Sequence, residues 1–209
     1  MADNGQGIRR PPQQARAQAR MQRILDEAAA LIASKGSEQV KMSEIAERAE
    51  VPIGSVYQFF PDKTAIIRTL AEVYMARIRE ALVAGLADIA SPADALGRVG
   101  VLLDEYYALF LSEPVMRDIW GGIQGDKLIQ DLDIADSREN GQVVFDALKR
   151  FVDARGRPRF KTACFLVLHM TGAAVRMAIA VERKEGERLF EEYKALMVRE
   201  LGAFLKLPA

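Results

Sequence analysis

The spacing of the apolar residues constrains the fold of this chain more than any other feature of its sequence. In nearly every segment they recur every three or four residues, as in Met21, Ile24, Leu25, Ala28, Leu31 and Ile32. This spacing places them on one face of a helix. No run alternates polar and apolar residues with the β-branched side chains typical of a strand. The sequence therefore predicts an all-α protein.

Capping and turn residues divide the chain into successive helices. The tetrad Ser91-Pro92-Ala93-Asp94 has the residue types favoured at the N-cap and in the first turn of a helix. Glu113-Pro114 predicts a break between helices. We expect a further helix over residues 127–154, and we expect the last two helices to meet at Lys184-Glu185-Gly186.

The composition is that of a globular protein whose charge is unevenly distributed. Half of the residues are apolar, and 29 Lys and Arg balance 29 Asp and Glu. Zero net charge argues against a protein that coats nucleic acid by electrostatics alone. Residues 1–25 nevertheless carry five Arg and one Asp. We expect residues 1–19 to form a disordered basic arm, either a solvated tail or a source of extra DNA contacts through Arg9, Arg10 and Arg16.

The sequence does not favour catalytic or metal chemistry. Its one His and one Cys, His169 and Cys164, lie on the same apolar segment, and it has no Gly-rich phosphate loop. We therefore expect no catalytic residue, no metal site and no cofactor. A polar N-terminus without a secretory signal, together with a single Cys that allows no intramolecular disulfide, predicts a cytoplasmic protein.

Residues 42–60 have the pattern of two short helices joined by a tight turn. Inward-facing positions are predicted for Ile45, Ala46 and Ala49 in the first helix, Val51 at the corner, and Val56, Phe59 and Phe60 in the second. A helix-turn-helix of this kind places its second helix in the major groove of DNA. The sequence thus predicts double-stranded DNA as a partner.

The motif I-A-x-x-A-x-V-x-x-G-S-V-Y-x-x-F, followed by Lys63, resembles the DNA-binding domain of the TetR family of transcriptional regulators. The resemblance covers about residues 20–67. It implies an N-terminal three-helix helix-turn-helix domain, which we place at residues 20–62. It also implies a larger C-terminal helical ligand-binding and dimerisation domain, at residues 63–209, whose last two helices form the dimer interface.

The resemblance also implies the DNA contacts. Residues near base edges are Met42, Ser43, Ile53, Gly54, Tyr57 and Gln58, and residues near phosphates are Lys41, Ser55, Tyr57 and Lys63. Their chemistry agrees, because the Gln58 amide can bond adenine, Gly54 permits close approach and Lys63 can neutralise a phosphate. The alternatives are a Tyr57 that lies half in the core and a Lys63 that is merely solvated.

Three residues depart from the family pattern, and one of them is Pro52, which replaces a usual Ser and suits the first helical position. Glu50 stands where the turn usually has Gly, and a residue other than Gly at positive φ would cost about 1 kcal/mol. Lys41 stands where a Thr commonly touches phosphate, and it can still attract phosphate as a point charge.

The segment 162–181 is apolar on nearly every face and long enough to cross a membrane. His169 and Arg176 lie inside it and charged residues flank it, so we expect no membrane contact. We expect instead that one face meets the core and another meets a second subunit. The last two helices therefore predict a homodimer.

A small, largely apolar effector is expected to bind between the middle helices. The candidate ligand-binding residues are Tyr106, Phe110, Met116, Trp120, Phe165 and His169, each of which could equally be ordinary core. The sequence therefore predicts a repressor that binds a pseudo-palindromic operator and is released by the effector. The alternative is a helical ligand-binding or protein-interaction module without DNA readout, and an enzyme is the least favoured class.

Overall fold

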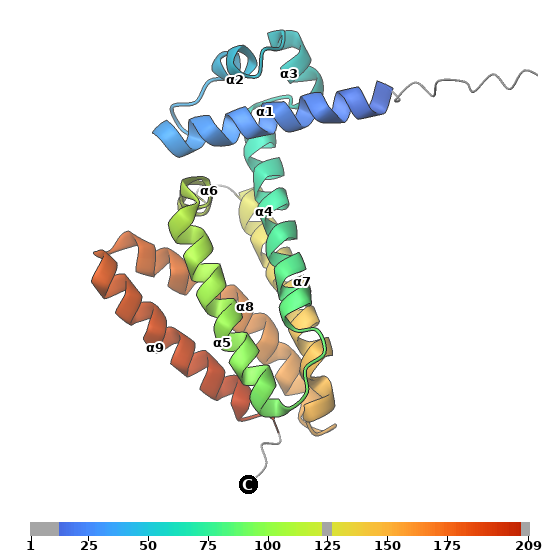
Figure 1. Cartoon of the computed structure of the whole chain (residues 1–209), viewed down its shortest axis with the longest axis vertical. Coiled ribbons are helices and arrows are strands. Elements are labelled where there is room, and N and C mark those ends of the chain that lie inside the picture. The colour runs from blue at the N-terminus through green and yellow to red at the C-terminus, as the bar shows by residue number, and fades with distance from the viewer. Residues whose placement is uncertain (1–12, 123–126, 206–209) are drawn as a thin grey trace, which may run out of the picture. The chain divides into compact units, whose positions relative to one another are not determined.

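The computed structural model describes residues 13–122 and 127–205, and the regular elements among them are helices (Figure 1). One isolated bridge joins Val152 to Leu205. The all-α prediction is confirmed. The helices are α1 (Gln13–Lys35), α2 (Met42–Arg48), α3 (Ile53–Phe59), α4 (Lys63–Gly85), α5 (Pro92–Ser112), α6 (Pro114–Gly121), α7 (Lys127–Leu148), η2 (Lys149–Phe151), α8 (Arg157–Ala180) and α9 (Arg183–Gly202).

The chain divides into two compact units between Leu70 and Ala71, inside α4. The domain boundary that the sequence led us to expect, after residue 62, lies at the start of α4. Asp62 accepts a hydrogen bond from the Ala65 backbone N–H at 2.8 Å and so caps α4 at this point. The helix is continuous across the division, and each unit contains part of it.

The start of α1 corrects one expectation. The helix begins at Gln13, so residues 13–19 of the predicted disordered arm are helical. This stretch consists only of Gln, Ala and Arg, which have high helix propensity, and it needs no apolar face to extend the helix. Residues 1–12, with Arg9 and Arg10, lie outside the described residues, and their disorder stays a prediction.

The first unit packs α1, α2 and α3 around a small apolar core. Ile24 and Ala28 of α1, Ile45 of α2 and Val56 of α3 have no exposed surface. The inward faces predicted for the two motif helices are therefore present, except that Phe59 is only half-buried.

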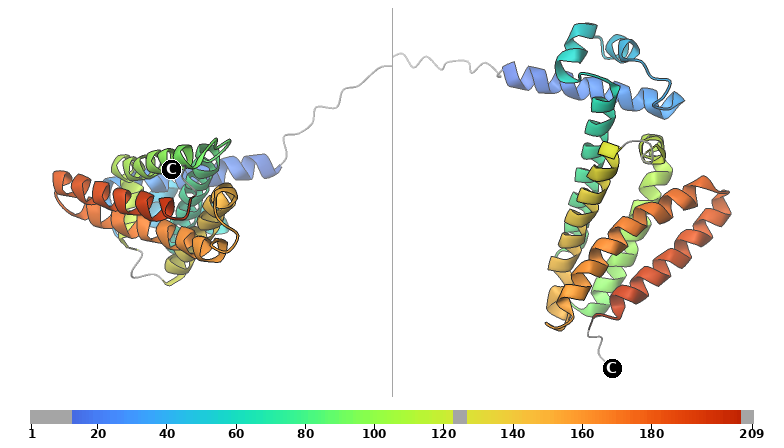
Figure 2. Two further views of the ribbon diagram at one scale, coloured as in Figure 1. Left: turned by 90° about the horizontal axis from the view of Figure 1, so that it is seen from below. Right: turned by 180° about the vertical axis from the view of Figure 1, so that it is seen from behind.

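The second unit contains the rest of α4 and helices α5 to α9. Helix α8 packs against α7 on one side and α9 on the other (Figure 2). The predicted cap of α5 is present, since the Ser91 hydroxyl accepts a hydrogen bond from the Asp94 backbone N–H at 3.1 Å. Helix α7 ends at Leu148, earlier than the expected residue 154, and is followed by a short 3-10 helix.

The junction between the last two helices also differs from expectation. It lies at Val181 and Glu182, and Gly186 is inside α9. Gly186 is a helical residue placed where α9 crosses α8, since a Cβ at this position would lie 2.0 Å from the Ala178 carbonyl oxygen. The glycine permits close helix packing and does not end a helix.

Helices α8 and α9 retain an exposed apolar face. Leu166, Met170 and Met177 of α8 are 57%, 46% and 52% exposed, and Leu196 of α9 is 46% exposed. By length and composition alone, α8 could cross a membrane, the one described helix that could. Its packing against α5, α7 and α9 places it within a helical bundle, so this face needs a different explanation.

Candidate functional site

Helix α3 presents a small exposed surface opposite its buried side. Val56 is fully buried, and Phe60 just after the helix is nearly so, whereas Ile53 and Tyr57 are 42% and 52% exposed. Gly54 and Gln58 are also exposed. These four residues are the α3 positions predicted to lie near base edges, and they share one face of the helix because they follow the i, i+1, i+4, i+5 spacing.

The remaining predicted DNA-contact residues also belong to the first unit. Lys41 and Ser43, at the start of α2, are exposed, while Met42 and Ser55 are half-buried. A Cβ placed on Gly54 would meet nothing within 4 Å, so the space in front of this residue is open. The unit therefore offers a helix face that is free to approach a large, flat partner.

The turn between α2 and α3 has the shape that the family motif requires. Glu50 has a φ of 52°, in the left-handed region that favours Gly. The Val51 backbone N–H donates to the Ala46 carbonyl at 3.0 Å, which closes the end of α2. The chain therefore retains the tight turn at the cost of backbone strain at Glu50.

Replacing Glu50 with Gly is expected to stabilise the protein by about 0.5 to 1 kcal/mol. The substitution removes the steric penalty at positive φ, and the greater freedom of Gly in the unfolded chain offsets part of the gain. Chemical denaturation of the two proteins measures the difference. An unchanged or lower free energy of unfolding would show that Glu50 is not strained.

Two ion pairs connect α2 to α1. The Lys35 ammonium donates to both carboxylate oxygens of Glu44 at 2.6 and 2.8 Å. Arg48 of α2 pairs with Glu27 of α1 at 2.8 Å. Both pairs are partly exposed, so they contribute to the position of α2 more than to stability.

Lys63 has a structural contact that the sequence did not predict. Its ammonium donates to the Ser37 and Glu38 carbonyl oxygens at 2.6 and 3.0 Å, and so connects the start of α4 to the segment after α1. An ammonium group has three donors, and the third is free for a phosphate.

Three arginines of α1 form an exposed basic face. Arg16, Arg20 and Arg23 follow the i, i+4, i+7 spacing, and all three are exposed. None of them makes an ion pair within the described part of the chain. Their charge is thus available to a phosphate backbone.

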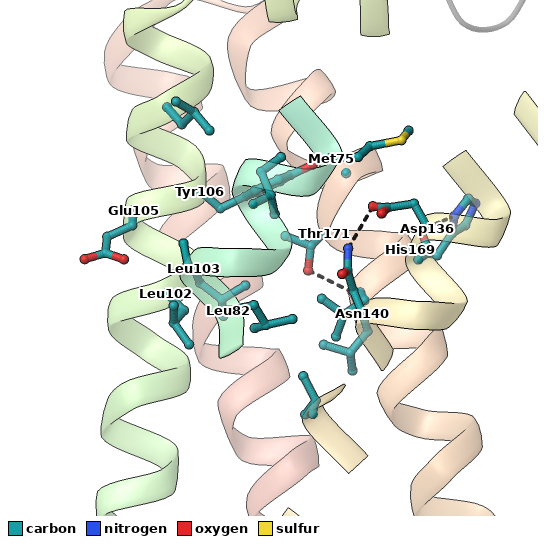
Figure 3. A pocket seen from close by; sticks show the side chains of 18 of the residues that line it. Met75, Leu82, Leu102, Leu103, Glu105, Tyr106, Asp136, Asn140, His169 and Thr171 are labelled. Atoms are coloured by element: carbon teal, nitrogen blue, oxygen red, sulfur yellow. Dashed lines mark hydrogen bonds between the residues drawn. The ribbon is translucent and has the colours of Figure 1, made fainter. Parts of the chain in front are cut away.

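The second unit encloses a cavity of about 260 Å³. Its walls come from α4, α5, α6, α7 and α8 with one residue of α9, and they are mostly apolar, with Met75, Leu82, Leu102, Leu103 and Val144 among them (Figure 3). Polar side chains enter from one face of α7, at Asp133, Asp136, Ser137 and Asn140. An apolar space with a few convergent polar groups is typical of a small-molecule site.

Three of the six predicted ligand-binding residues line the cavity, namely Tyr106, Trp120 and His169. The other three do not. Phe110 and Met116 have no exposed surface and belong to the core beside Trp120, where the Phe110 and Trp120 rings meet edge to face at 5.8 Å. The Phe165 ring lies under the Arg138 guanidinium, 4.5 Å from the ring centre.

Asp133 lies close to two other residues that line the cavity. Its carboxylate accepts a hydrogen bond from Trp120 Nε1 at 3.2 Å and lies 3.7 Å from His169 Nδ1. The His169 Nδ1 atom is in turn 3.2 Å from the Ser137 hydroxyl. Trp120 therefore reports directly on this part of the cavity.

Arg79 of α4 connects that helix to the cavity wall. Its guanidinium forms ion pairs with Asp136 and Glu139 of α7, and its Nε donates to Asn140 Oδ1 at 3.2 Å. Asn140 in turn donates to Asp136 at 2.7 Å. Burial raises the pKa of Asp136, and the hydrogen bond and charge of Arg79 oppose that rise.

The sequence interpretation missed the α7 residues, although their pattern was visible. Asp133, Asp136, Ser137 and Asn140 follow the i, i+3, i+4, i+7 spacing, which usually marks an apolar face. Ser137 and Asn140 are only 7% and 5% exposed. A polar stripe on the inward side of a helix indicates a lined cavity, because buried polar groups need partners.

Comparison with known proteins assigns both parts of the chain. Residues 24–70 match the family described as "Bacterial regulatory proteins, tetR family", and residues 93–205 match "Tetracyclin repressor-like, C-terminal domain". The HTH-type transcriptional repressor KstR of Rhodococcus jostii is 44% identical over 48 residues. That match spans only 23% of each chain.

Solved structures resemble the chain over most of its length. A TetR-family transcriptional regulator from Streptomyces coelicolor is 25% identical, with a TM-score of 0.69, over 91% of this chain and 99% of that one. A regulator from Pectobacterium atrosepticum has the same TM-score at 17% identity, over 95% of this chain and 100% of that one. With the helix-turn-helix and the C-terminal domain both matched, the chain belongs to the TetR family of bacterial transcriptional regulators.

Proposed function

We propose that this protein is a homodimeric repressor that binds a pseudo-palindromic operator and releases it when a small, largely apolar effector fills the cavity. The observation that carries this proposal is the position of α4. This helix begins in the DNA-binding unit with Lys63 and then lines the cavity of the second unit with Met75 and Leu82. A change in the cavity can therefore reach the DNA-binding unit through one continuous helix.

The exposed face of α3 is the proposed base-reading surface. Ile53 offers an apolar contact for a thymine methyl, Tyr57 and Gln58 offer hydrogen bonds, and Gly54 allows close approach. Lys41, Met42 and Ser43 of the α2 start, with Ser55, complete the proposed contact set, and Lys63 supplies its free donor to a phosphate. The basic face of α1 adds further phosphate contacts.

Replacing Gln58 with Ala is expected to relax the preference at one operator position and to cost about 1 to 3 kcal/mol of specific binding. Gln58 is exposed, so the substitution leaves the core unchanged. Selection from randomised DNA with both proteins measures the preference. The same base preferences in both selections would exclude a base-reading role for Gln58.

The exposed apolar face of α8 and α9 is the proposed dimer interface. Leu166, Met170 and Met177 form one stripe on α8, since they are separated by four and seven residues. A self-complementary contact through such a face gives a twofold dimer. The twofold axis in turn requires two inverted half-sites, with the recognition helices about 34 to 36 Å apart or at a wider spacing if two dimers bind.

Arg79 is the proposed link between the cavity and α4. A ligand that displaces Asp136 or Asn140 weakens the hold of these residues on Arg79 and frees α4 to shift. Such a ligand acts only through its differential affinity for the two states, so DNA must weaken ligand binding by the same factor.

Replacing Arg79 with Met is expected to reduce the effect of a cavity ligand on operator affinity by about fivefold or more, while ligand binding persists. Operator affinity with and without ligand, measured by fluorescence anisotropy, gives the coupling. Arg183→Met is the matched control, because Arg183 makes an exposed pair with Glu187 on α9. Full coupling in Arg79→Met would remove this link from the mechanism.

Selection of bound fragments from genomic DNA tests the proposed function as a whole. The expected product is an inverted repeat that the protein retains in the presence of competing random DNA. Enrichment of single, unpaired sites would contradict the dimer, and no enrichment at all would favour a ligand-binding module without DNA readout.

A further inference from the structure

We propose that the cavity selects apolar ligands whose head group donates a hydrogen bond, an alcohol or an amine, and that it discriminates against carboxylates. This inference deepens the proposed function, since it rests on the cavity as the effector site. The groups that carry it are Asp133 and Tyr106, whose hydrogen-bonding capacity is not fully used by the protein.

Most polar side chains around the cavity already have partners. Arg79 and Asn140 satisfy Asp136. The Thr171 hydroxyl donates to the Val167 carbonyl at 2.8 Å and lies 2.8 Å from the Tyr193 hydroxyl. These groups are occupied with one another and leave little capacity for a ligand.

Asp133 has free acceptor positions in the cavity. Its side chain is 16% exposed, and within the described residues it accepts one hydrogen bond, from Trp120. The 3.7 Å separation from His169 Nδ1 is too long for a second. A carboxylate can accept about four hydrogen bonds, so Asp133 can receive a donor from a ligand.

Tyr106 is the second group with unused capacity. Figure 3 shows its side chain extending from α5 into the cavity, towards Met75. Its hydroxyl makes no hydrogen bond to any described residue. Burial, and next the charge of Asp133, raise the pKa of Tyr106 and keep the phenol neutral. A neutral phenol both donates and accepts, so it can bond an alcohol or an amine alongside Asp133.

The charge of Asp133 disfavours an anion at its free acceptor positions. Arg79 is engaged with Asp136 and Glu139 of α7, and Arg77, whose side chain is 62% exposed, is 3.7 Å from Glu113. The Nη1 atom of Arg176 has no partner among the described residues and is buried near the Tyr106 hydroxyl, since a Cβ on Gly172 would be 3.2 Å from the first atom and 3.7 Å from the second. A ligand carboxylate placed at the free acceptor positions of Asp133 would meet a second carboxylate there, which is a repulsive contact.

Titration of the full chain with decanol, decylamine, decanoate and decyl methyl ether at about pH 8 tests this selectivity. Calorimetry gives the affinities and Trp120 fluorescence reports on occupancy. Decanol and decylamine should each bind about tenfold or more tightly than decanoate and the ether, because the latter two have no donor. The difference between the alcohol and the amine identifies the preferred donor.

Two substitutions assign the selectivity to its residues. Asp133→Asn keeps an acceptor for Trp120, and in this variant decylamine should bind more weakly and the affinity for decanoate should approach that for decanol. Asp131→Asn is the control at an exposed position of α7 and should leave all four affinities unchanged. Tyr106→Phe should lower the affinity for decanol severalfold. Tyr107→Phe is its control, because the Tyr107 hydroxyl is also buried without a partner but lies off the cavity.

The inference is overturned if decanoate binds wild type as tightly as decanol, if none of the four compounds binds, or if Asp133→Asn keeps the full preference. Operator affinity in the same titrations separates this inference from the release mechanism. Release by decanoate alone would refute the selectivity and retain the mechanism. If the alcohol or the amine binds in a way that depends on Asp133 but leaves the operator affinity unchanged, the selectivity is retained and the release mechanism is refuted.

Discussion

Replacing Gly54 with Leu is expected to lower operator affinity by about 100-fold or more while leaving the fold intact. Gly54 lies on the exposed face of α3, and a Cβ there meets nothing within 4 Å, so the protein itself accommodates a larger side chain. In the proposed operator complex the same space is occupied by base edges. A leucine would hold α3 away from the groove and remove several base contacts in each half-site, each contributing about 1 to 3 kcal/mol.

The matched control is Gly97→Leu on α5, where the added side chain also meets open space. Both variants should unfold at or slightly above the wild-type temperature, since Leu is the better helix former. A mobility shift with operator and random DNA then distinguishes them. Wild-type operator affinity in Gly54→Leu would mean that this face of α3 does not enter the groove.

Replacing Gly186 with Ala is expected to destabilise the second unit by about 3 kcal/mol. A Cβ at Gly186 would lie 2.0 Å from the Ala178 carbonyl oxygen and 3.3 Å from the Tyr107 hydroxyl. The closest obstacle is backbone, which cannot rotate away, so α9 must move off α8. Overpacking of this kind typically costs about 1 to 3 kcal/mol or more, and here it also opens the helix pair proposed to form the dimer.

Thermal unfolding measures the effect, expected as a fall of about 6 to 12 °C in Tm. Gly97→Ala is the control, because its Cβ meets open space inside a helix and should stabilise by about 0.5 to 1 kcal/mol. Equal Tm values for Gly186→Ala and wild type would show that α8 and α9 do not pack this closely.

The sequence predicted the DNA-binding helices better than the cavity because short-range patterns specify them. The apolar positions of α2 and α3, the tight turn and the glycine of the recognition helix all lie within residues 42–60. The fold class followed from the same periodicity. Gly186 was misplaced as a helix junction because a glycine that ends a helix and one that allows two helices to approach are identical in sequence.

The cavity depends on contacts between residues far apart in the chain. Phe110 and Phe165 are aromatic residues on middle helices, as Tyr106 is, and only the packing of α5 against α6 and α8 determines which rings face the cavity. Arg79 and Asp136 are 57 residues apart, and their pairing cannot be derived from local spacing. The polar stripe of α7 was the one local signal for this site.

A reciprocal titration measures the proposed coupling between the cavity and the operator-binding surface. Compounds that quench Trp120 are titrated into the free protein and into the protein saturated with its selected operator. We expect each effector to bind the operator complex more weakly than the free protein, by a coupling free energy of about 1 to 3 kcal/mol. Equal or tighter binding to the operator complex would contradict release by the effector.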